Sequence, residues 1–205
     1  MHYPERENIM PSRIAQVDRT TKETDIHITL NIDGSGKSDI QTGIGFFDHM
    51  LEGFSKHGFF DLFCQVKGDL YVDGHHTVED TGIVLGQAIK EAVGDKKGIR
   101  RYGYFILPMD ETLALCAVDL CGRPYLRFEC DFPVERVGSL DTELIKEFFY
   151  AVSYSAGMNL HIKMLSEGNA HHMIEAMFKA FAKALDMACS RDERINDVLS
   201  TKGAL

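Results

Sequence analysis

The stretches GHHTVEDTGIVLGQAI (residues 74–89) and AHHMIEAMFKAFAKAL (residues 170–185) decide the fold of this chain. Each begins with His-His-x-x-Glu and continues with apolar residues at helical spacing. This pattern predicts an amphipathic helix that is entered through the histidine pair. Because the whole pattern occurs twice, it indicates an internal duplication, which changes the meaning of every other motif.

Further segments repeat in the same order. Glu23-Thr24 and Glu111-Thr112 each open an alternating run that predicts a strand followed by a turn. Residues 46–58 and 142–157 have apolar residues at helical spacing and end in glycine. Equivalent segments lie about 88 to 98 residues apart, and each half has the order strands, helix, strand, helix.

These patterns predict an α+β fold with two similar halves. Residues 1–95 form the first repeat with an N-terminal segment, residues 96–190 the second repeat, and residues 191–205 a C-terminal extension. Each half is expected to be a small β-sheet with two helices on one face, and the bare faces are expected to pack together.

Composition narrows the class of protein. The 31 acidic and 22 basic residues give a net charge of −9, which disfavours nucleic acid and anionic membranes as partners. The five cysteines form no CxxC pair, so we expect reduced thiols rather than a zinc ribbon or a disulfide framework. With no leader or apolar membrane span in the sequence, a cytoplasmic location is expected.

The duplicated motif has the side chains of a two-metal site. Residues i and i+4 share a helix face, so His75 can bind one ion with Glu79 while His76 faces elsewhere. The same holds for His171 with Glu175, and for His172. We expect each site to combine the His/Glu pair of one helix with the odd histidine of the other, in the same chain or between chains.

The preceding helix of each half offers a fourth ligand, His49 or Glu147. Four ligands leave two positions open on an octahedral ion, as a ligand-exchanging site needs. Imidazole and carboxylate donors without thiolate favour Mn²⁺ or Fe²⁺, with Zn²⁺ as an alternative. A single HHxxE is usually a solvated patch, and only its recurrence favours metal binding. The other histidines, His2, His27, His57 and His161, are expected to be core or surface residues.

A second cluster is basic. Lys96, Lys97, Arg100 and Arg101 surround a glycine-containing turn, Arg123 lies in a Gly-Arg-Pro turn, and Ser200-Thr201-Lys202-Gly203 nearly ends the chain. Taken singly, these are typical of solvated turns and a frayed tail. Together they offer the donors that a phosphate dianion needs.

In order along the chain, GIGFFDHML, DGHHTVEDTGIVLGQA, PMDETLA, CGRPYL, DTELIKEFF, LHI, GNAHHMIEAMFKAFAKAL and STKG resemble the motif series of the imidazoleglycerol-phosphate dehydratase family. The resemblance spans roughly residues 13–203. It implies a duplicated fold like that of ribosomal protein S5 domain 2, two Mn²⁺ ions per subunit, and a homo-oligomeric shell, a 24-mer, with active sites between subunits.

The resemblance also assigns roles to residues. It places metal ligands at His49, His75, His76, Glu79, His171, His172 and Glu175. Where many members carry His before the Phe-Phe pair, this chain has Glu147, which we expect to ligate through its carboxylate. Substrate contacts are expected from Glu23, His49, Arg101, Arg123, Ser200 and Lys202.

The family's lyase reaction, in histidine biosynthesis, dehydrates D-erythro-imidazole glycerol phosphate to imidazole acetol phosphate. No carbonyl lies beside the C2 proton, so we expect the ring, held as a metal-bound imidazolate, to act as the electron sink. Glu23, His76 and His172 are the expected catalytic residues, with Glu23 as the base and Glu79 or Glu175 as alternatives. Two competing interpretations are a two-metal hydrolase of a phosphorylated substrate and a metal-storage shell.

Overall fold

The first half of the chain forms four strands and two helices in the expected order. The computed structural model describes residues 13–205; residues 1–12, with His2 and the N-terminal segment, lie outside the described residues. The elements are β1 (Ile14–Thr20), β2 (Thr24–Asn31), β3 (Ser38–Gln41), α1 (Gly45–Gly58), β4 (Asp61–Gly68) and α2 (His75–Val93).

The second half repeats this order and adds one short hairpin. Its elements are β5 (Tyr102–Met109), β6 (Thr112–Asp119), β7 (Tyr125–Glu129), β8 (Arg136–Val137), β9 (Leu140–Asp141), α3 (Leu144–Ala156), β10 (Asn159–Ser166) and α4 (Ala170–Cys189). The hairpin of β8 and β9 lies immediately before α3 and has no counterpart in the first half.

The two four-stranded sheets have the same topology. Their strand orders are β1-β2-β4-β3 and β5-β6-β10-β7. In each sheet the first three strands pair antiparallel and the last pair is parallel. A parallel neighbour needs a crossover connection, and α1 and α3 provide it. The internally duplicated α+β fold is therefore confirmed.

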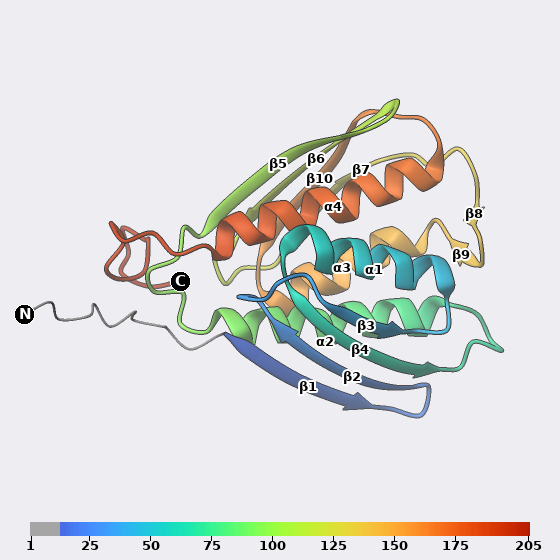
Figure 1. Cartoon of the computed structure of the whole chain (residues 1–205), viewed down its shortest axis with the longest axis horizontal. Helices are drawn as coiled ribbons and strands as arrows, with labels where there is room; N and C mark the ends of the chain where they lie inside the picture. The colour runs from blue at the N-terminus through green and yellow to red at the C-terminus, as the bar shows by residue number, and fades with distance from the viewer. Residues whose placement is uncertain (1–12) are drawn as a thin grey trace, which may run out of the picture.

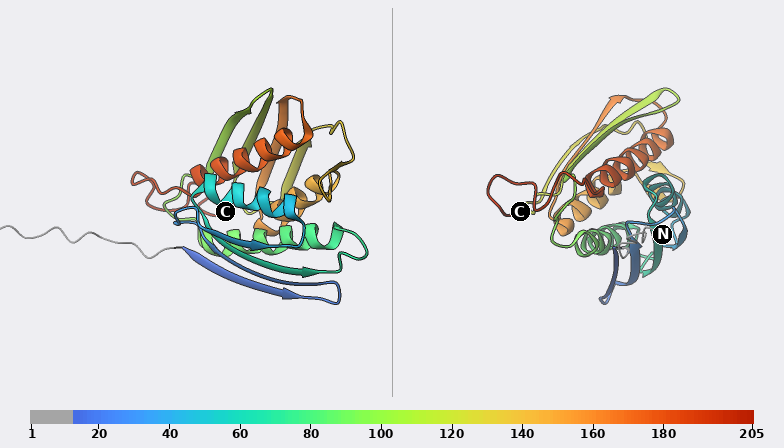
Figure 2. Two further views of the ribbon diagram at one scale, coloured as in Figure 1. Left: turned by 45° about the vertical axis from the view of Figure 1, so that its right-hand side comes forward. Right: turned by 60° about the vertical axis from the view of Figure 1, so that its left-hand side comes forward.

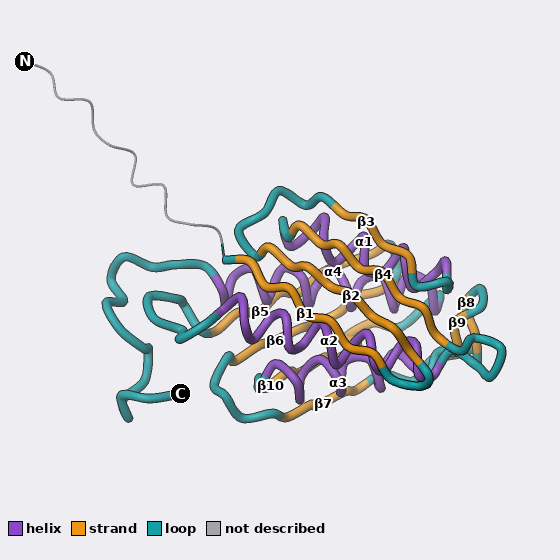
Figure 3. The backbone as a smooth tube through the Cα atoms, turned by 90° about the horizontal axis from the view of Figure 1, so that it is seen from below, coloured by secondary structure: helices purple, strands orange, loops and turns teal. Residues whose placement is uncertain are grey.

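The four helices form a layer between the two sheets (Figure 1). Figure 2 shows the same layering from two other directions, and Figure 3 shows the first sheet from below with the helices behind it. Helix α2 packs against α3, and α1 packs against α4, so each contact joins the two halves. The expectation that the bare sheet faces pack together is wrong. The helix faces are the more apolar ones and meet in the centre, so that none of residues 13–205 forms a layer over the outer sheet faces.

Aromatic contacts join the halves in the core. Phe47 of α1 lies edge-on to Phe148 of α3, with ring centroids 5.3 Å apart, and Phe54 stacks on Phe181 of α4 at 5.4 Å. All four side chains are essentially fully buried. Burial of rings this large contributes strongly to folding, so neither half has a complete core of its own.

The helix pair α2 and α3 approaches closely at two glycines. A Cβ atom on Gly82 would lie 2.8 Å from the carbonyl oxygen of Phe148, and one on Gly86 would lie 2.6 Å from that of Val152. Both distances are shorter than van der Waals contact, so only glycine allows this separation of the helices. None of the helices in residues 13–205 combines the length and hydrophobicity that a membrane crossing requires.

Candidate functional site

The His-His-x-x-Glu motifs form the first turns of α2 and α4. The Asp73 carboxylate accepts a hydrogen bond from the His75 backbone at 2.8 Å, and the Asn169 side chain accepts one from the His171 backbone at 2.9 Å. These bonds satisfy orphan amides at the helix starts. The spacing then brings His75 Nε2 to 3.6 Å from Glu79 Oε2, and the corresponding atoms of His171 and Glu175 to 3.2 Å.

One motif already has a third donor in the same chain. Among residues 13–205, His49, His171 and Glu175 form a group whose donor atoms lie within 4.8 Å of one another. His49 Nε2 is 3.7 Å from Glu175 Oε2. His49 therefore lies beside the motif of the other half, not beside His75 of its own half, because α1 packs on α4.

Glu175 is held as a carboxylate by its neighbours. Partial burial acts to raise its pKa, but the hydrogen bond and charge of Lys179, together with His49 and His171, lower the pKa overall. Lys179 Nζ lies 2.7 Å from Glu175 Oε1. The other carboxylate oxygen faces the two histidines, where it is available to a cation.

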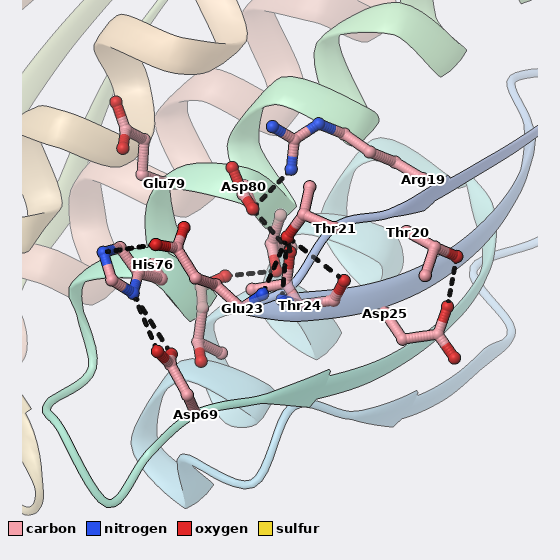
Figure 4. A network of polar contacts seen from close by, with 12 residues as sticks. Arg19, Thr20, Thr21, Glu23, Thr24, Asp25, Asp69, His76, Glu79 and Asp80 are labelled. Carbon is pink, nitrogen blue, oxygen red and sulfur yellow. Dashed lines mark hydrogen bonds and ion pairs between the residues drawn. The ribbon is translucent and has the colours of Figure 1, made fainter.

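The odd histidine of each motif has a carboxylate on its Nδ1 atom, which Figure 4 shows for His76 and Asp69. His76 Nδ1 lies 3.0 Å from Asp69 Oδ2, and this hydrogen bond raises the pKa of His76. His172 Nδ1 lies 3.0 Å from Glu111 Oε2. A carboxylate on Nδ1 orients the ring and leaves Nε2 free to ligate, as in metal-binding histidines generally.

Glu23 and Glu111 occupy equivalent positions in the duplicated hairpins but are held differently. The Glu111 carboxylate accepts a hydrogen bond from the Asn169 backbone at 2.7 Å and contacts His172, and these bonds lower the pKa of Glu111 to about 2. The Glu23 carboxylate lies 3.9 Å from Nε2 of His76, the side opposite Asp69. Of these two glutamates, only Glu23 therefore lies on the Nε2 side of its histidine.

Glu147 of α3 is the counterpart of His49, 98 residues further along the chain (147 minus 49). Within residues 13–205, the Glu147 carboxylate forms no hydrogen bond or ion pair with His75 or Glu79. This carboxylate and that of Glu79 both help to raise the pKa of Tyr150, after the hydrogen bond between Tyr150 and Tyr154 and after desolvation. Glu147 and Glu79 thus both lie near Tyr150, where α3 packs against α2.

Part of the basic cluster expected from the sequence lines one cavity. A cavity of about 800 Å³ is lined by Arg101, Arg123, Ser200 and Lys202. Arg101 binds the Asp119 carboxylate at 2.7 and 3.1 Å and donates to the carbonyl oxygen of Leu199 at 2.7 Å. Arg101 therefore ties the C-terminal segment over the cavity and keeps few donors for an anion. Arg123 and Lys202 are the remaining cations among the expected substrate contacts.

Three residues near these sites were not expected from the sequence. Asp69 and Glu111 orient the odd histidines, and Arg194 lines the basic cavity. The duplicated Glu-Thr pair was a signal for Glu111, since its counterpart Glu23 was singled out. Lys96, Lys97 and Arg100 do not line this cavity.

The candidate metal ligands and the basic cavity lie at opposite ends of the helix layer. The Arg101 backbone donates to the carbonyl oxygen of Ala188 at 2.9 Å, near the C-terminal end of α4, whereas His171 begins that helix. The 17 residue steps from His171 to Ala188 (188 minus 171) correspond to about 25 Å at 1.5 Å per residue. Figure 1 shows the C-terminal segment at one end of the helix layer and the starts of α2 and α4 at the other.

Comparisons with known proteins point to one family. The family model for imidazoleglycerol-phosphate dehydratase matches residues 42–185. The imidazoleglycerol-phosphate dehydratase of Lachnoclostridium phytofermentans is 66% identical over 95% of this chain and 99% of that protein. The crystal structure of the Staphylococcus aureus imidazoleglycerol-phosphate dehydratase superposes with a TM-score of 0.80 at 45% identity, covering 87% of this chain and 99% of that one. A Pyrococcus furiosus structure, in complex with (S)-C348, gives 0.80 at 36% identity, covering 92% and 100%.

Proposed function

This chain belongs to the imidazoleglycerol-phosphate dehydratase family of histidine biosynthesis, and we propose that it performs the dehydration with two divalent metal ions held between subunits. The substrate is D-erythro-imidazole glycerol phosphate and the product imidazole acetol phosphate. The proposal that each active site lies between subunits rests on one observation, the separation of the ligating histidines from the basic cavity.

The donor set fits divalent cations. One ion would be held by His49, His171 and Glu175, whose donor atoms already lie within 4.8 Å of one another. The other would be held by His75 and Glu79 with Glu147. His76 and His172 would complete the sites of neighbouring subunits. The group with His171 and Glu175 would receive His76, and the group with His75 and Glu79 would receive His172. No thiolate stands among these donors, which favours Mn²⁺ or Fe²⁺, and we propose Mn²⁺.

Subunit contacts at this end of the chain would complete the sites. The loop before α2 exposes Tyr71 and Val72, with relative accessibilities of 91% and 57%, directly before the ligands His75 and His76. Exposed apolar side chains beside an incomplete polar site are typical of an interface. They support a homo-oligomer, for which the family resemblance implies 24 subunits. A cytoplasmic location completes the proposal, since all five cysteines are free.

The ions, when bound, would hold the substrate ring as an imidazolate, which supplies the electron sink for loss of the C3 hydroxyl. Glu23 would remove the C2 proton, because its carboxylate lies 3.9 Å from the ligating nitrogen of His76 and is not engaged by a backbone amide as Glu111 is. Arg123, Ser200 and Lys202 would hold the phosphate and orient the reacting carbons. Arg101 would keep the C-terminal segment in place for this contact.

Three measurements on the purified protein test the proposal. Wild type should form imidazole acetol phosphate without releasing phosphate, and should bind two ions per subunit. His76→Ala and His172→Ala should lose turnover and metal together. Retained turnover in a metal-free variant would contradict the dehydratase mechanism. Phosphate release would favour a two-metal hydrolase, and bound metal with no turnover would favour a storage shell.

A further inference from the structure

A buried carboxylate connects the metal-binding helix to the hairpin that carries Glu23. Asp80 follows the ligand Glu79 in α2 and is only 6% exposed. It accepts a hydrogen bond from Thr24 Oγ1 at 2.5 Å and forms an ion pair with Arg19 of β1 (Figure 4). A buried charge is costly unless paired and hydrogen bonded. The position of the hairpin of β1 and β2 that brings both Arg19 and Thr24 to Asp80 is therefore strongly favoured.

The hairpin turn passes this constraint to Glu23. Thr24 directly follows Glu23, and Thr21 Oγ1 lies 3.3 Å from the Thr24 hydroxyl. The same Thr21 oxygen accepts hydrogen bonds from the backbone amides of Glu23 and Thr24, at 3.1 and 3.0 Å. The backbone of Glu23 is thus fixed from both sides while its carboxylate stays beside His76.

The second half of the chain lacks this arrangement. Leu107 and Ala176 stand where the first half has Arg19 and Asp80, at offsets of 88 and 96 residues. The Thr112 hydroxyl, equivalent to that of Thr24, donates instead to the carbonyl oxygen of Met109 at 2.9 Å. In this half Glu111 is held through its own carboxylate by the Asn169 backbone. Of the two glutamates, the Arg19, Asp80 and Thr24 cluster therefore accompanies the one whose carboxylate is not held by a backbone amide as Glu111 is.

We propose that Arg19, Asp80 and Thr24 are positioning residues that hold Glu23 at the distance needed for proton transfer from the substrate. The inference rests on the proposed function, in which Glu23 is the base. Rotation of the turn would displace the carboxylate without removing any metal ligand. The cluster should then affect the proton-transfer step and leave metal binding intact.

The duplication provides a matched pair of variants for the test. Thr24→Val and Thr112→Val each replace a hydroxyl in a nearly identical setting, since the two residues are 2% and 1% exposed. Thr24→Val should lower kcat by about tenfold or more, with KM and metal content unchanged. It should also raise the kinetic isotope effect with substrate deuterated at C2. Thr112→Val should stay within about twofold of wild type, and Thr24→Ser should restore kcat by restoring the hydroxyl.

Asp80→Asn provides a second variant, since it keeps the shape and an acceptor for Thr24 but removes the charge that pairs with Arg19. It too should raise the isotope effect at unchanged metal content. Equal losses in Thr24→Val and Thr112→Val, or loss of metal in Thr24→Val, would overturn the proposal. Glu23→Gln tests the base assignment separately from the positioning role. If Glu23→Gln keeps full turnover, the base assignment fails. If Glu23→Gln is inactive while Thr24→Val has normal turnover, only the positioning role fails.

Discussion

Co-assembly of two inactive variants tests whether one active site draws on different subunits. The first variant, His171→Ala/Glu175→Ala, removes two of the three donors that lie within 4.8 Å of one another. The second, Arg123→Ala/Lys202→Ala, removes two of the cations that line the basic cavity, the two that are proposed to hold the phosphate. Each variant alone is expected to lack turnover, the first without metal at the altered site and the second with normal metal content.

The distance between the two parts of the site determines how much turnover the mixed assembly should have. His171 and the Ala188 carbonyl that anchors Arg101 lie at opposite ends of α4, about 25 Å apart, so one small substrate cannot span them within a subunit. In an equimolar mixed assembly each site would find an intact ligand group half of the time and an intact basic cavity half of the time. About a quarter of wild-type turnover is therefore expected from random mixing. If both parts came from one subunit, the mixture would be inactive.

The assay requires subunits that assemble together, for example by co-expression with two affinity tags and isolation of the doubly tagged particle. Turnover is measured as formation of imidazole acetol phosphate per subunit. Assemblies of wild type with either variant should retain about half of the activity. Variants mixed after assembly should stay inactive. Inactive mixed particles containing metal and both subunit types would refute the intersubunit site.

Three further predictions concern packing, metal selectivity and pH. Gly82→Ala should destabilise the protein by up to about 2 kcal/mol in denaturant unfolding, because overpacking costs about 1 to 3 kcal/mol and helix propensity returns about 1. Gly53→Ala, with no atom within 4 Å of the new Cβ, should instead stabilise the protein, and equal behaviour of the two variants would refute the close contact of α2 and α3. Glu147→His should increase the retention of Zn²⁺ relative to Mn²⁺ during dialysis against a chelator, since imidazole is the softer donor. An unchanged metal content in both Glu147→His and Glu147→Ala would exclude Glu147 as a ligand. The hydrogen bond from Arg13 lowers the pKa of Asp33 against the effect of burial, so its contribution to stability is present above the unfolded pKa of about 4 and is lost as pH falls through the lower folded value. Asp33→Asn should therefore be less stable than wild type at pH 7, and a stability difference that did not begin to shrink as the pH fell below about 4 would contradict this.

Local patterns were sufficient to predict most of the fold. The helix periodicity after His75 and His171 matches α2 and α4, and the alternating runs after Glu23 and Glu111 match β2 and β6. These elements follow from short-range spacing of apolar residues, which the sequence displays directly. The layering was predicted incorrectly, because nothing local distinguishes a sheet packed on a sheet from helices packed on helices.

The site was only partly accessible from the sequence. The His/Glu pairs follow from helical geometry, since i and i+4 share a face. The position of His49 beside Glu175 depends on packing between halves, and the contact between Asp69 and His76 depends on the loop that precedes α2. The position of Lys202 near Arg123 depends on the path of the C-terminal segment. Such long-range arrangements arise from tertiary packing, which leaves no periodic trace in the chain.

The exchange of helix partners between halves, with α1 on α4 and α2 on α3, bears on how the polypeptide folds and how it originated. A fragment ending after α2 would expose the aromatic surface that Phe148 and Phe181 cover, so two such fragments would be driven to associate. Fusing them in tandem raises the effective concentration of each for the other and removes the dependence on protein concentration. Unfolding intermediates with one half intact should accordingly be scarce, and an ancestral gene half as long would have encoded a dimer with the same interior.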